Sequence, residues 1–244
     1  MLVLALETTG KYGSAALIDG KGNIACSSSS TEMNHLKDIV FLADECIKKM
    51  GVEKKDIDYI ATDIGPGSFT GIRIGVTTAR TMAQMLGLKC IAVSSLEALA
   101  LEAIPETGDE EYQYVCPIIN ARRHQTYAGM WMVDGFVEEL PQKQYMIEEI
   151  IDEVKKLDGK VLFTGDGIDA YASIIEETLP SDKFAYTSEP CRYQTAEFIA
   201  WLALDKIKDG KAVSYGELMP NYMRLSEAEQ RLKEGTLSKK ITEA

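Results

Sequence analysis

DIGPGSFTGIRIG, residues 63–75, joins a short apolar strand to the start of an amphipathic helix. A strand, a glycine-rich turn and a helix in this order indicate an α/β fold. Ser68 or Thr70 can accept hydrogen bonds from the free N–H groups of the helix start, where the helix dipole also favours an anion. No Lys follows as in a P-loop, and Thr70 stands where the dinucleotide motif needs glycine. Two interpretations therefore stay open, a structural tight turn and a ligand contact.

Hydrophobic periodicity predicts the same order of elements on both sides of an acidic linker at 105–111. Alternating or apolar runs predict strands, and apolar residues at helical spacing predict helices. The first half is expected to contain strands 2–8, 13–18, 23–29 and 59–64, helices 36–50 and 72–86, and then strand 89–93 and helix 95–103. The second half is expected to contain strands 113–120, 125–133, 136–140 and 160–164, with helices 147–157 and 168–179. Helix 196–208 follows, and then a short extended piece and a charged helix within 220–234.

Two βββαβα units in tandem predict two mixed α/β domains, residues 1–104 and 105–244. Each unit resembles the ribonuclease H-like half of the actin, sugar-kinase and Hsp70 architecture. The second domain is expected to carry the C-terminal helix and tail.

Composition limits the function. The 26 Lys and Arg against 38 Asp and Glu leave a net charge of −12, which disfavours a protein that binds nucleic acid unaided. No apolar run reaches the roughly 18 residues that a membrane-spanning helix needs. Five separated cysteines without a CxxC pair suit reduced thiols. We therefore expect a soluble, unexported, cytoplasmic protein with no metal site.

Five stretches together resemble the TsaB (YeaZ) family. They are GPGSFTGIRIG, LALETTGKYGSAAL, VSSLEALA, NARRHQTYAGMW and PNYMRLSEAEQR, and they extend over nearly the whole chain. The signature loop comprises Gly65, Pro66, Gly67, Ser68, Phe69, Thr70, Gly71 and Arg73.

The resemblance implies an actin-like two-domain fold and a non-catalytic role. Such a chain would support TsaD, the transferase that builds threonylcarbamoyl-adenosine in tRNA, together with the ATPase TsaE. It would form a homodimer when isolated and meet tRNA only through the complex. An actin-fold small-molecule kinase and a glycoprotease-like peptidase are the alternatives; the chain shows no preserved phosphate loops and no metal motif, and no Ser, His and acid grouping can be picked from the sequence.

Two departures from ATP-using relatives bear on chemistry. Glu7, followed by Thr8 and Thr9, stands where actin-like ATPases carry a magnesium-linked Asp, which indicates a degenerate nucleotide site. TsaD relatives hold a metal through two histidines one helical turn apart, but the residue four positions after His35 is Ile39. No cofactor is expected in the chain itself, and nucleotide binding at a partner interface stays open.

The helix after the signature shows two stripes. One stripe should face the core and consists of Ile72, Val76, Ala79, Ala83 and Leu86. The neighbouring stripe of small residues and methionines suits contact with another chain, and it consists of Gly71, Gly75, Thr78, Met82 and Met85. Phe41 and Leu42 of the preceding helix are expected to add apolar surface. The alternative is a wider core that covers both stripes.

Two turns of the second half carry weaker signals. The turn Ala121-Arg122-Arg123-His124 is expected at the surface, where the arginines could meet an anion or the carboxylates of a partner. The run 165–167, GDG, follows a strand at a place where actin-like proteins approach an adenine or ribose, and it is interpreted as a helix-entry turn.

Overall fold

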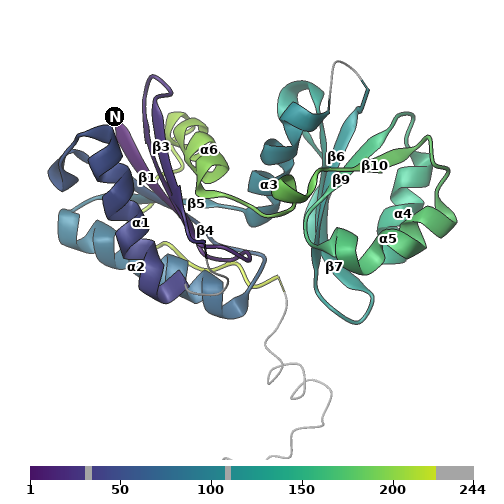
Figure 1. The fold of residues 1–244 in the computed structure, drawn as a ribbon, viewed down its shortest axis with the longest axis horizontal. Helices are drawn as coiled ribbons and strands as arrows, with labels where there is room; N and C mark the ends of the chain where they lie inside the picture. Colours follow the sequence, from purple (N-terminus) through teal and green to yellow (C-terminus); the bar gives the residue numbers. More distant parts are fainter. Residues whose placement is uncertain (31–34, 108–110, 224–244) are drawn as a thin grey trace, which may run out of the picture.

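The structure, a computed structural model, describes residues 1–30, 35–107 and 111–223 (Figure 1). Two five-stranded mixed sheets lie side by side, each flanked by helices. The first contains β1 (Leu2–Glu7), β2 (Ser14–Asp19), β3 (Ile24–Ser28), β4 (Tyr59–Asp63) and β5 (Lys89–Val93). The second contains β6 (Tyr114–Asn120), β7 (Gln125–Met132), β8 (Glu138–Met146), β9 (Val161–Thr164) and β10 (Phe184–Tyr186).

The two sheets have the same topology. Their strand orders are β3-β2-β1-β4-β5 and β8-β7-β6-β9-β10. In each, three strands form an antiparallel meander and the remaining two run parallel to the first strand of that meander. The prediction of two tandem ribonuclease H-like domains is confirmed.

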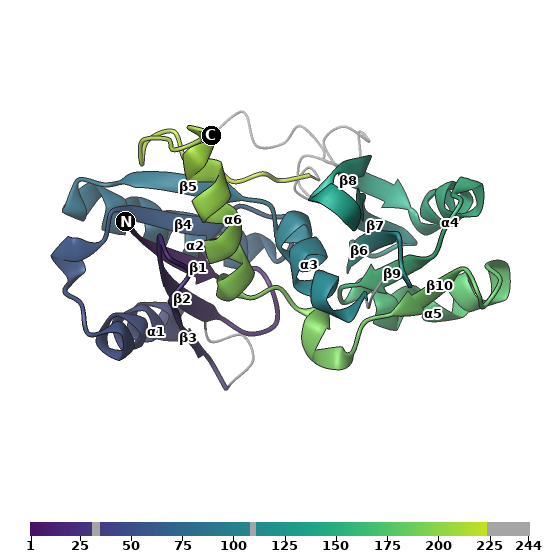
Figure 2. The same cartoon turned by 90° about the horizontal axis from the view of Figure 1, so that it is seen from above.

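Helices cover both faces of the first sheet (Figure 2). On one face, α1 (His35–Met50) and α2 (Phe69–Leu86) bury a core with Leu4, Leu6 and Leu17. On the other face, α6 (Ala196–Lys208) packs against β1, where Ile199 lies in one core cluster with Val3 and Ala5.

The second sheet is covered on one face by α4 (Ile147–Lys156) and α5 (Gly167–Thr178), whose apolar residues surround Phe163. Its other face packs against α3 (Ser95–Ala103), whose Leu96 and Leu99 lie in one core cluster with Trp131. Because α3 also contacts α6, this helix lies at the seam between the two sheets.

The domains do not divide at residues 104 and 105 as expected, because part of the chain after residue 105 packs on the first sheet. Helix α6 belongs to the core of the first sheet, although it follows the second sheet in sequence. The chain after α6 stays with the first sheet, because Val213 forms a bridge with Cys90 and Leu218 is buried in the first core. The first sheet needs this returning segment to cover its second apolar face. The C-terminal helix therefore does not pack with the second domain.

The predicted elements are observed with local differences. Strand β8 extends to Met146, so the expected strand 136–140 is wrong in its length, and β10 had no counterpart in the prediction. Helix α2 already begins at Phe69, and Leu86 at its end is 42% exposed instead of buried in the core. The expected charged helix near the C-terminus lies outside the described residues. Among the helices that the structure describes, none is long and apolar enough to cross a membrane.

Candidate functional site

The signature loop connects β4 to α2, and its glycines are places of close approach. A Cβ atom on Gly71 would lie 1.9 Å from the carbonyl oxygen of Thr8, and one on Gly75 would lie 2.5 Å from the Thr8 hydroxyl. A Cβ on Gly67, which also has a φ of +156°, would lie 2.8 Å from Cβ of Thr9. The glycines thus let the start of α2 pack directly on the turn after β1.

Two N–H groups at the start of α2 are bonded within the chain. Gly71 N donates to the Ser68 hydroxyl at 3.2 Å, and Ser68 N donates to the carbonyl oxygen of Thr9 at 3.0 Å. The Thr8 hydroxyl donates to the carbonyl oxygen of Gly71 at 2.8 Å. A helix N-terminus binds an anion when its N–H groups are free to point at one. Here Thr8 and Thr9 occupy that place, which favours the structural interpretation of the turn.

Two carboxyl groups lie together beneath this turn, at the ends of the neighbouring strands β1 and β4. Glu7 Oε1 accepts hydrogen bonds from Thr9 N at 2.6 Å and Gly10 N at 2.8 Å. The Thr9 hydroxyl lies 3.0 Å from Glu7 Oε1 and also hydrogen-bonds to Oδ2 of Asp63. Glu7 and Asp63 are both fully buried. One oxygen of each, Glu7 Oε2 and Asp63 Oδ1, makes no hydrogen bond to the described residues.

Burial determines the protonation of this pair. It raises the pKa of Glu7 well above the usual value, and the charge of Asp63 raises it further, although hydrogen bonds from Gly10 and Thr9 act in the opposite direction. Burial also raises the pKa of Asp63, against the hydrogen bonds from Thr9 and Ser95. Two adjacent buried carboxyl groups cannot both be ionised without a large cost. Burial therefore favours a shared proton on the pair, and Glu7, whose pKa the charge of Asp63 also raises, takes it more readily.

Distant residues complete the network around Thr9. Ser95, at the start of α3, donates to Asp63 Oδ2 at 3.1 Å. Gln194, just before α6, donates from Nε2 to the Thr9 hydroxyl at 2.7 Å. The sequence prediction gave no role to Asp63, Ser95 or Gln194. Asp63 could have been found, because it ends a buried strand, but Gln194 is 185 positions from Thr9 and no local pattern connects them.

The expected nucleotide residues thus come together in a closed arrangement. The exposed fractions of Glu7, Thr8 and Thr9 are 0%, 0% and 4%. A phosphate group placed here would meet a buried pair of carboxyl groups, and the N–H groups of Ser68 and Gly71 at the helix start are already bonded to Thr9 and to the Ser68 hydroxyl. Among the described residues, no group of three or more His, Cys, Asp or Glu side chains could hold a metal ion.

The outer side of the signature loop binds the chain's own C-terminal segment. The guanidinium of Arg73 lies 4.0 Å from the centre of the Phe69 ring, and Nε donates to the Tyr222 hydroxyl at 3.1 Å. The two rings are 4.8 Å apart, centre to centre. Beside them, Asn221 N donates to the carbonyl oxygen of Ile64 at 2.9 Å. Phe69 and Arg73 therefore fasten residues 221–222 next to the start of α2.

The expected partner surface is only partly at the surface. Gly75 packs against Thr8 and Thr62, and Leu42 is 7% exposed within the first core, so both predictions are wrong. Gly71 is buried for the same reason as Gly75. Thr78 and Met82 are half-buried.

Large apolar side chains reach solvent at two places on α1 and α2, which we together call the α1–α2 surface. It consists of Val40 and Phe41 in the first half of α1 and of Met85 and Leu86 at the end of α2, which are 52%, 72%, 81% and 42% exposed. Phe69 of α2, also 42% exposed, is left out because it packs against Tyr222. Large apolar side chains at this exposure are unfavourable in water, which makes both places candidate contact sites. Val40 and Leu86 were not part of the predicted surface.

The family model described as TsaD: tRNA N6-adenosine threonylcarbamoyltransferase matches residues 28–231. Fold and match together define a TsaD-like protein built from two ribonuclease H-like domains.

Comparison with individual proteins identifies the family within this class. The tRNA threonylcarbamoyladenosine biosynthesis protein TsaB of Bacillus subtilis (strain 168) is 31% identical over 233 residues, which cover 95% of this chain and 97% of that protein. The chain belongs to the TsaB (YeaZ) family. The solved structure of YeaZ from Pseudomonas aeruginosa superposes with a TM-score of 0.74 at 24% identity, over 91% of this chain and 99% of that one. A tRNA N6-adenosine threonylcarbamoyltransferase of Afipia carboxidovorans is 32% identical over 121 residues, 41% of this chain and 34% of that protein.

Proposed function

We propose that the chain is a non-catalytic subunit in the biosynthesis of threonylcarbamoyl-adenosine in tRNA. The observation that carries the proposal is the 31% identity to a TsaB protein over 95% of the chain. The closed Glu7–Asp63 pair supports the absence of catalysis, because it leaves no open phosphate site at the turn after β1. The same closure disfavours an actin-fold kinase.

The partner in this proposal is TsaD, and the α1–α2 surface is where it docks. Phe41 and Met85 supply apolar area that is 72% and 81% exposed in the isolated chain. Part of the chain is 32% identical to a transferase of the TsaD type, so the two proteins share a homologous domain. Homologous domains can meet through equivalent faces in a pseudo-twofold contact. The same surface would then join two copies of this chain when TsaD is absent.

The remaining assignments follow from the resemblance. TsaE is a further partner, tRNA is met only through the assembled complex, and the location is the cytoplasm. The net charge of −12 agrees with a chain that does not bind tRNA by itself. Nucleotide, where it binds, would lie at a shared interface and not at Glu7, Thr8 and Thr9.

Reconstitution tests the proposal. Purified chain, TsaD and TsaE from the same organism are mixed with tRNA and threonylcarbamoyl-adenylate, and the modified nucleoside is measured by mass spectrometry. We expect modification only when TsaD is present, and a much higher rate when the chain is added. Modification by the chain alone would contradict the non-catalytic role, and an unchanged rate without the chain would contradict the supporting role.

A further inference from the structure

The turn between β6 and β7 has an unusual backbone. Arg122, Arg123 and His124 have φ angles of 65°, 55° and 62°, so three consecutive non-glycine residues lie in the left-handed region. Residues other than glycine rarely adopt this region, because their Cβ then approaches the following carbonyl oxygen, and they usually do so singly. Backbone strain of this kind often accompanies a functional constraint.

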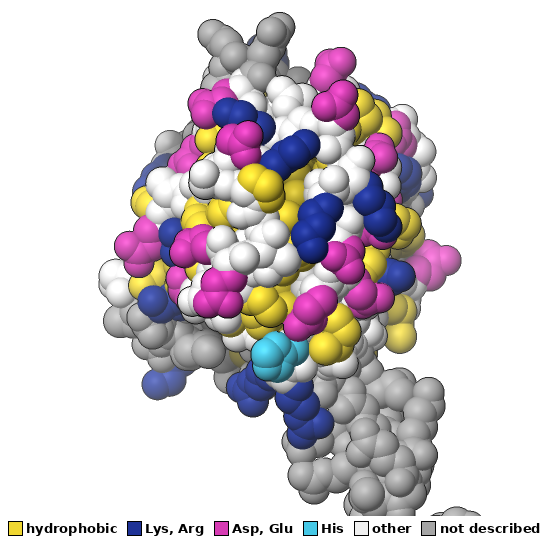
Figure 3. Space-filling view, turned by 90° about the vertical axis from the view of Figure 1, so that its right-hand side faces the viewer, with side chains coloured by type: hydrophobic (Ala, Val, Ile, Leu, Met, Phe, Trp, Pro, Cys, Tyr) yellow, Lys and Arg dark blue, Asp and Glu magenta, His cyan; other side chains and the backbone are white. Residues whose placement is uncertain are grey.

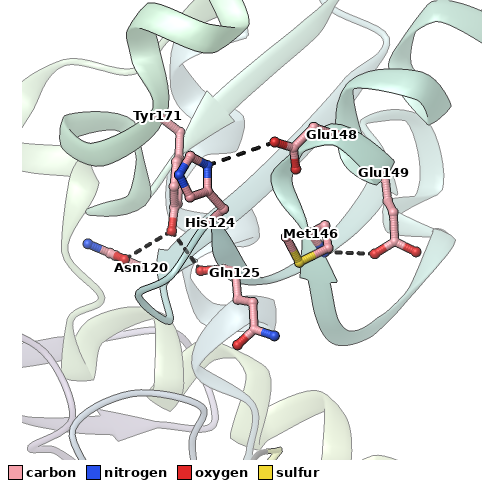
Figure 4. A network of polar contacts seen from close by, with 7 residues as sticks. All are labelled: Asn120, His124, Gln125, Met146, Glu148, Glu149 and Tyr171. Carbon is pink, nitrogen blue, oxygen red and sulfur yellow. Dashed lines mark hydrogen bonds and ion pairs between the residues drawn. The ribbon is translucent and has the colours of Figure 1, made fainter.

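A dense network fixes the turn in this conformation (Figure 4). Arg122 N donates to Asn120 Oδ1 at 2.8 Å, and Ile147 N donates to the carbonyl oxygen of His124 at 3.0 Å. The Tyr171 hydroxyl lies 2.7 Å from the carbonyl oxygen of Gln125 and 3.1 Å from Asn120 Oδ1. Because both ends are held, the three side chains project from a rigid base.

These side chains are cationic or can become so, and all three are exposed. Within the described part of the chain, neither Arg122 nor Arg123 forms a salt bridge, whereas Arg192 pairs with Asp169 at 2.9 Å. Two acids lie nearby: Glu148 Oε1 is 3.8 Å from Nδ1 of His124, and Asp166 Oδ1 accepts a hydrogen bond from Asn120 N at 3.0 Å. Figure 3 shows basic side chains gathered beside a histidine at the edge of this face of the molecule.

The turn borders a hollow of about 530 Å³. Its lining combines the three turn residues with the polar side chains of Asn120 and Ser173 and with residues of α5. Arginine guanidinium groups present several N–H donors in a fixed plane that matches phosphate oxygens. Two arginines on a fixed backbone beside a polar hollow are therefore suited to a phosphate group and its attached sugar.

We propose that the Arg122-Arg123-His124 turn contacts phosphates of the tRNA backbone when the chain is held in the TsaD complex. This inference rests on the function proposed above, which supplies the RNA. A chain with a net charge of −12 repels RNA as a whole, so two exposed arginines cannot hold tRNA alone. Once TsaD holds both molecules, the same two arginines add local contacts from a backbone whose conformation is already fixed.

The test compares tRNA binding by assembled complexes over a range of salt concentrations. One complex carries Arg122→Gln and Arg123→Gln. The matched control carries Lys155→Gln and Lys156→Gln, which remove the same charge from α4 of the same domain, where these lysines pair with Asp152 and Glu153. Thermal unfolding of each variant shows that the domain is intact.

We expect the arginine variant to bind tRNA at least about tenfold more weakly at low salt. The slope of log K against log salt should become less negative by about 1.4–1.8, since each lost phosphate contact accounts for about 0.7–0.9. The lysine control should keep the wild-type slope. A slope equal to that of the control would overturn the inference.

Two further outcomes separate the alternatives. If the arginine variant no longer assembles with TsaD, the turn binds a protein carboxylate and the inference is wrong. If it loses affinity for ADP or inorganic phosphate but not for tRNA, the hollow takes a small anion and the inference is again wrong. Failure of the wild-type chain to assemble with TsaD would instead refute the proposed function, and the inference would fall with it.

Discussion

Replacing Glu102 by Gln should stabilise the protein in alkaline solution. Glu102 lies on α3 at the seam between the sheets, is 7% exposed, and has one oxygen, Oε2, without a hydrogen bond to the described residues. Burial raises the pKa of Glu102 from 4.5 to about 8, against hydrogen bonds from Thr195, and the charge of Glu197 adds to the increase. Gln keeps the shape of the side chain but cannot ionise.

The direction of the pH effect on stability follows from the pH range in which the folded and unfolded chains bind the Glu102 proton. Below about pH 4.5 the carboxyl is protonated in both the folded and the unfolded chain. Between about pH 4.5 and 8 the unfolded chain has lost this proton and the folded chain keeps it, so stability decreases as pH rises. Each pH unit costs at most about 1.4 kcal/mol. The interval from pH 4.5 to about 8 limits the total loss of stability to about 5 kcal/mol. Partial access of water to the carboxyl reduces the expected loss to about 2–4 kcal/mol.

Urea unfolding of the variants and the wild type between about pH 3 and 9 measures this effect. The stability of Glu102→Gln relative to the wild type should increase with pH and level off near pH 8. Glu106→Gln is the control: despite partial burial, hydrogen bonds from Ser188 lower the pKa of Glu106, so its loss should destabilise at neutral pH and not in acid. A difference between Glu102→Gln and the wild type that does not change with pH would refute the reasoning.

Three further predictions concern the signature turn and the absence of activity. Gly71→Ala should lower the free energy of unfolding by about 2–4 kcal/mol in urea, because its Cβ would lie 1.9 Å from the Thr8 carbonyl oxygen. Gly51→Ala is the control: its site has open space but a φ of +67°, so it should cost about 1 kcal/mol. Equal costs for the two variants would contradict this packing. The isolated chain should not turn over ATP, and steady activity that Glu7→Ala abolishes would show a working nucleotide site. The isolated chain should also bind tRNA only weakly at physiological salt, so micromolar or tighter binding in a gel-shift assay would reveal a basic patch stronger than the Arg122–Arg123 turn.

Local patterns predicted most of the fold. Alternating apolar residues identified β1, β2 and β4, and helical spacing identified α1 and α2, because each element buries one face. The repeated order of elements predicted the two sheets. Periodicity could not show that α6 returns to the first sheet, since this depends on which apolar face is left uncovered after folding.

The site was harder to predict for the same reason. Gly71 and Gly75 form a stripe of small residues, and the sequence could not tell whether a second chain or the chain itself fills the space. The structure shows that the turn after β1, 63 positions before Gly71, fills it. Glu7 and Thr9 were recognised as a group, but their contacts to Asp63 and Gln194 depend on strand order and on the returning segment. Long-range contacts of this kind leave no periodic signal.

The most direct test of the proposed role is the affinity of the chain for TsaD after charges are placed on the α1–α2 surface. Phe41→Asp and Met85→Asp change its two most exposed side chains, and Val137→Asp and Met219→Asp are a control at 55% and 60% exposed positions elsewhere. Unpaired charges in a dry contact cost several kcal/mol, and each 1.4 kcal/mol is about tenfold in affinity.

Calorimetric titration with TsaD, alongside thermal unfolding, measures this affinity. We predict that the Phe41 and Met85 variant keeps the wild-type melting temperature and loses at least about a hundredfold in TsaD affinity, while the control keeps both. Wild-type affinity in the stably folded Phe41 and Met85 variant would contradict the account.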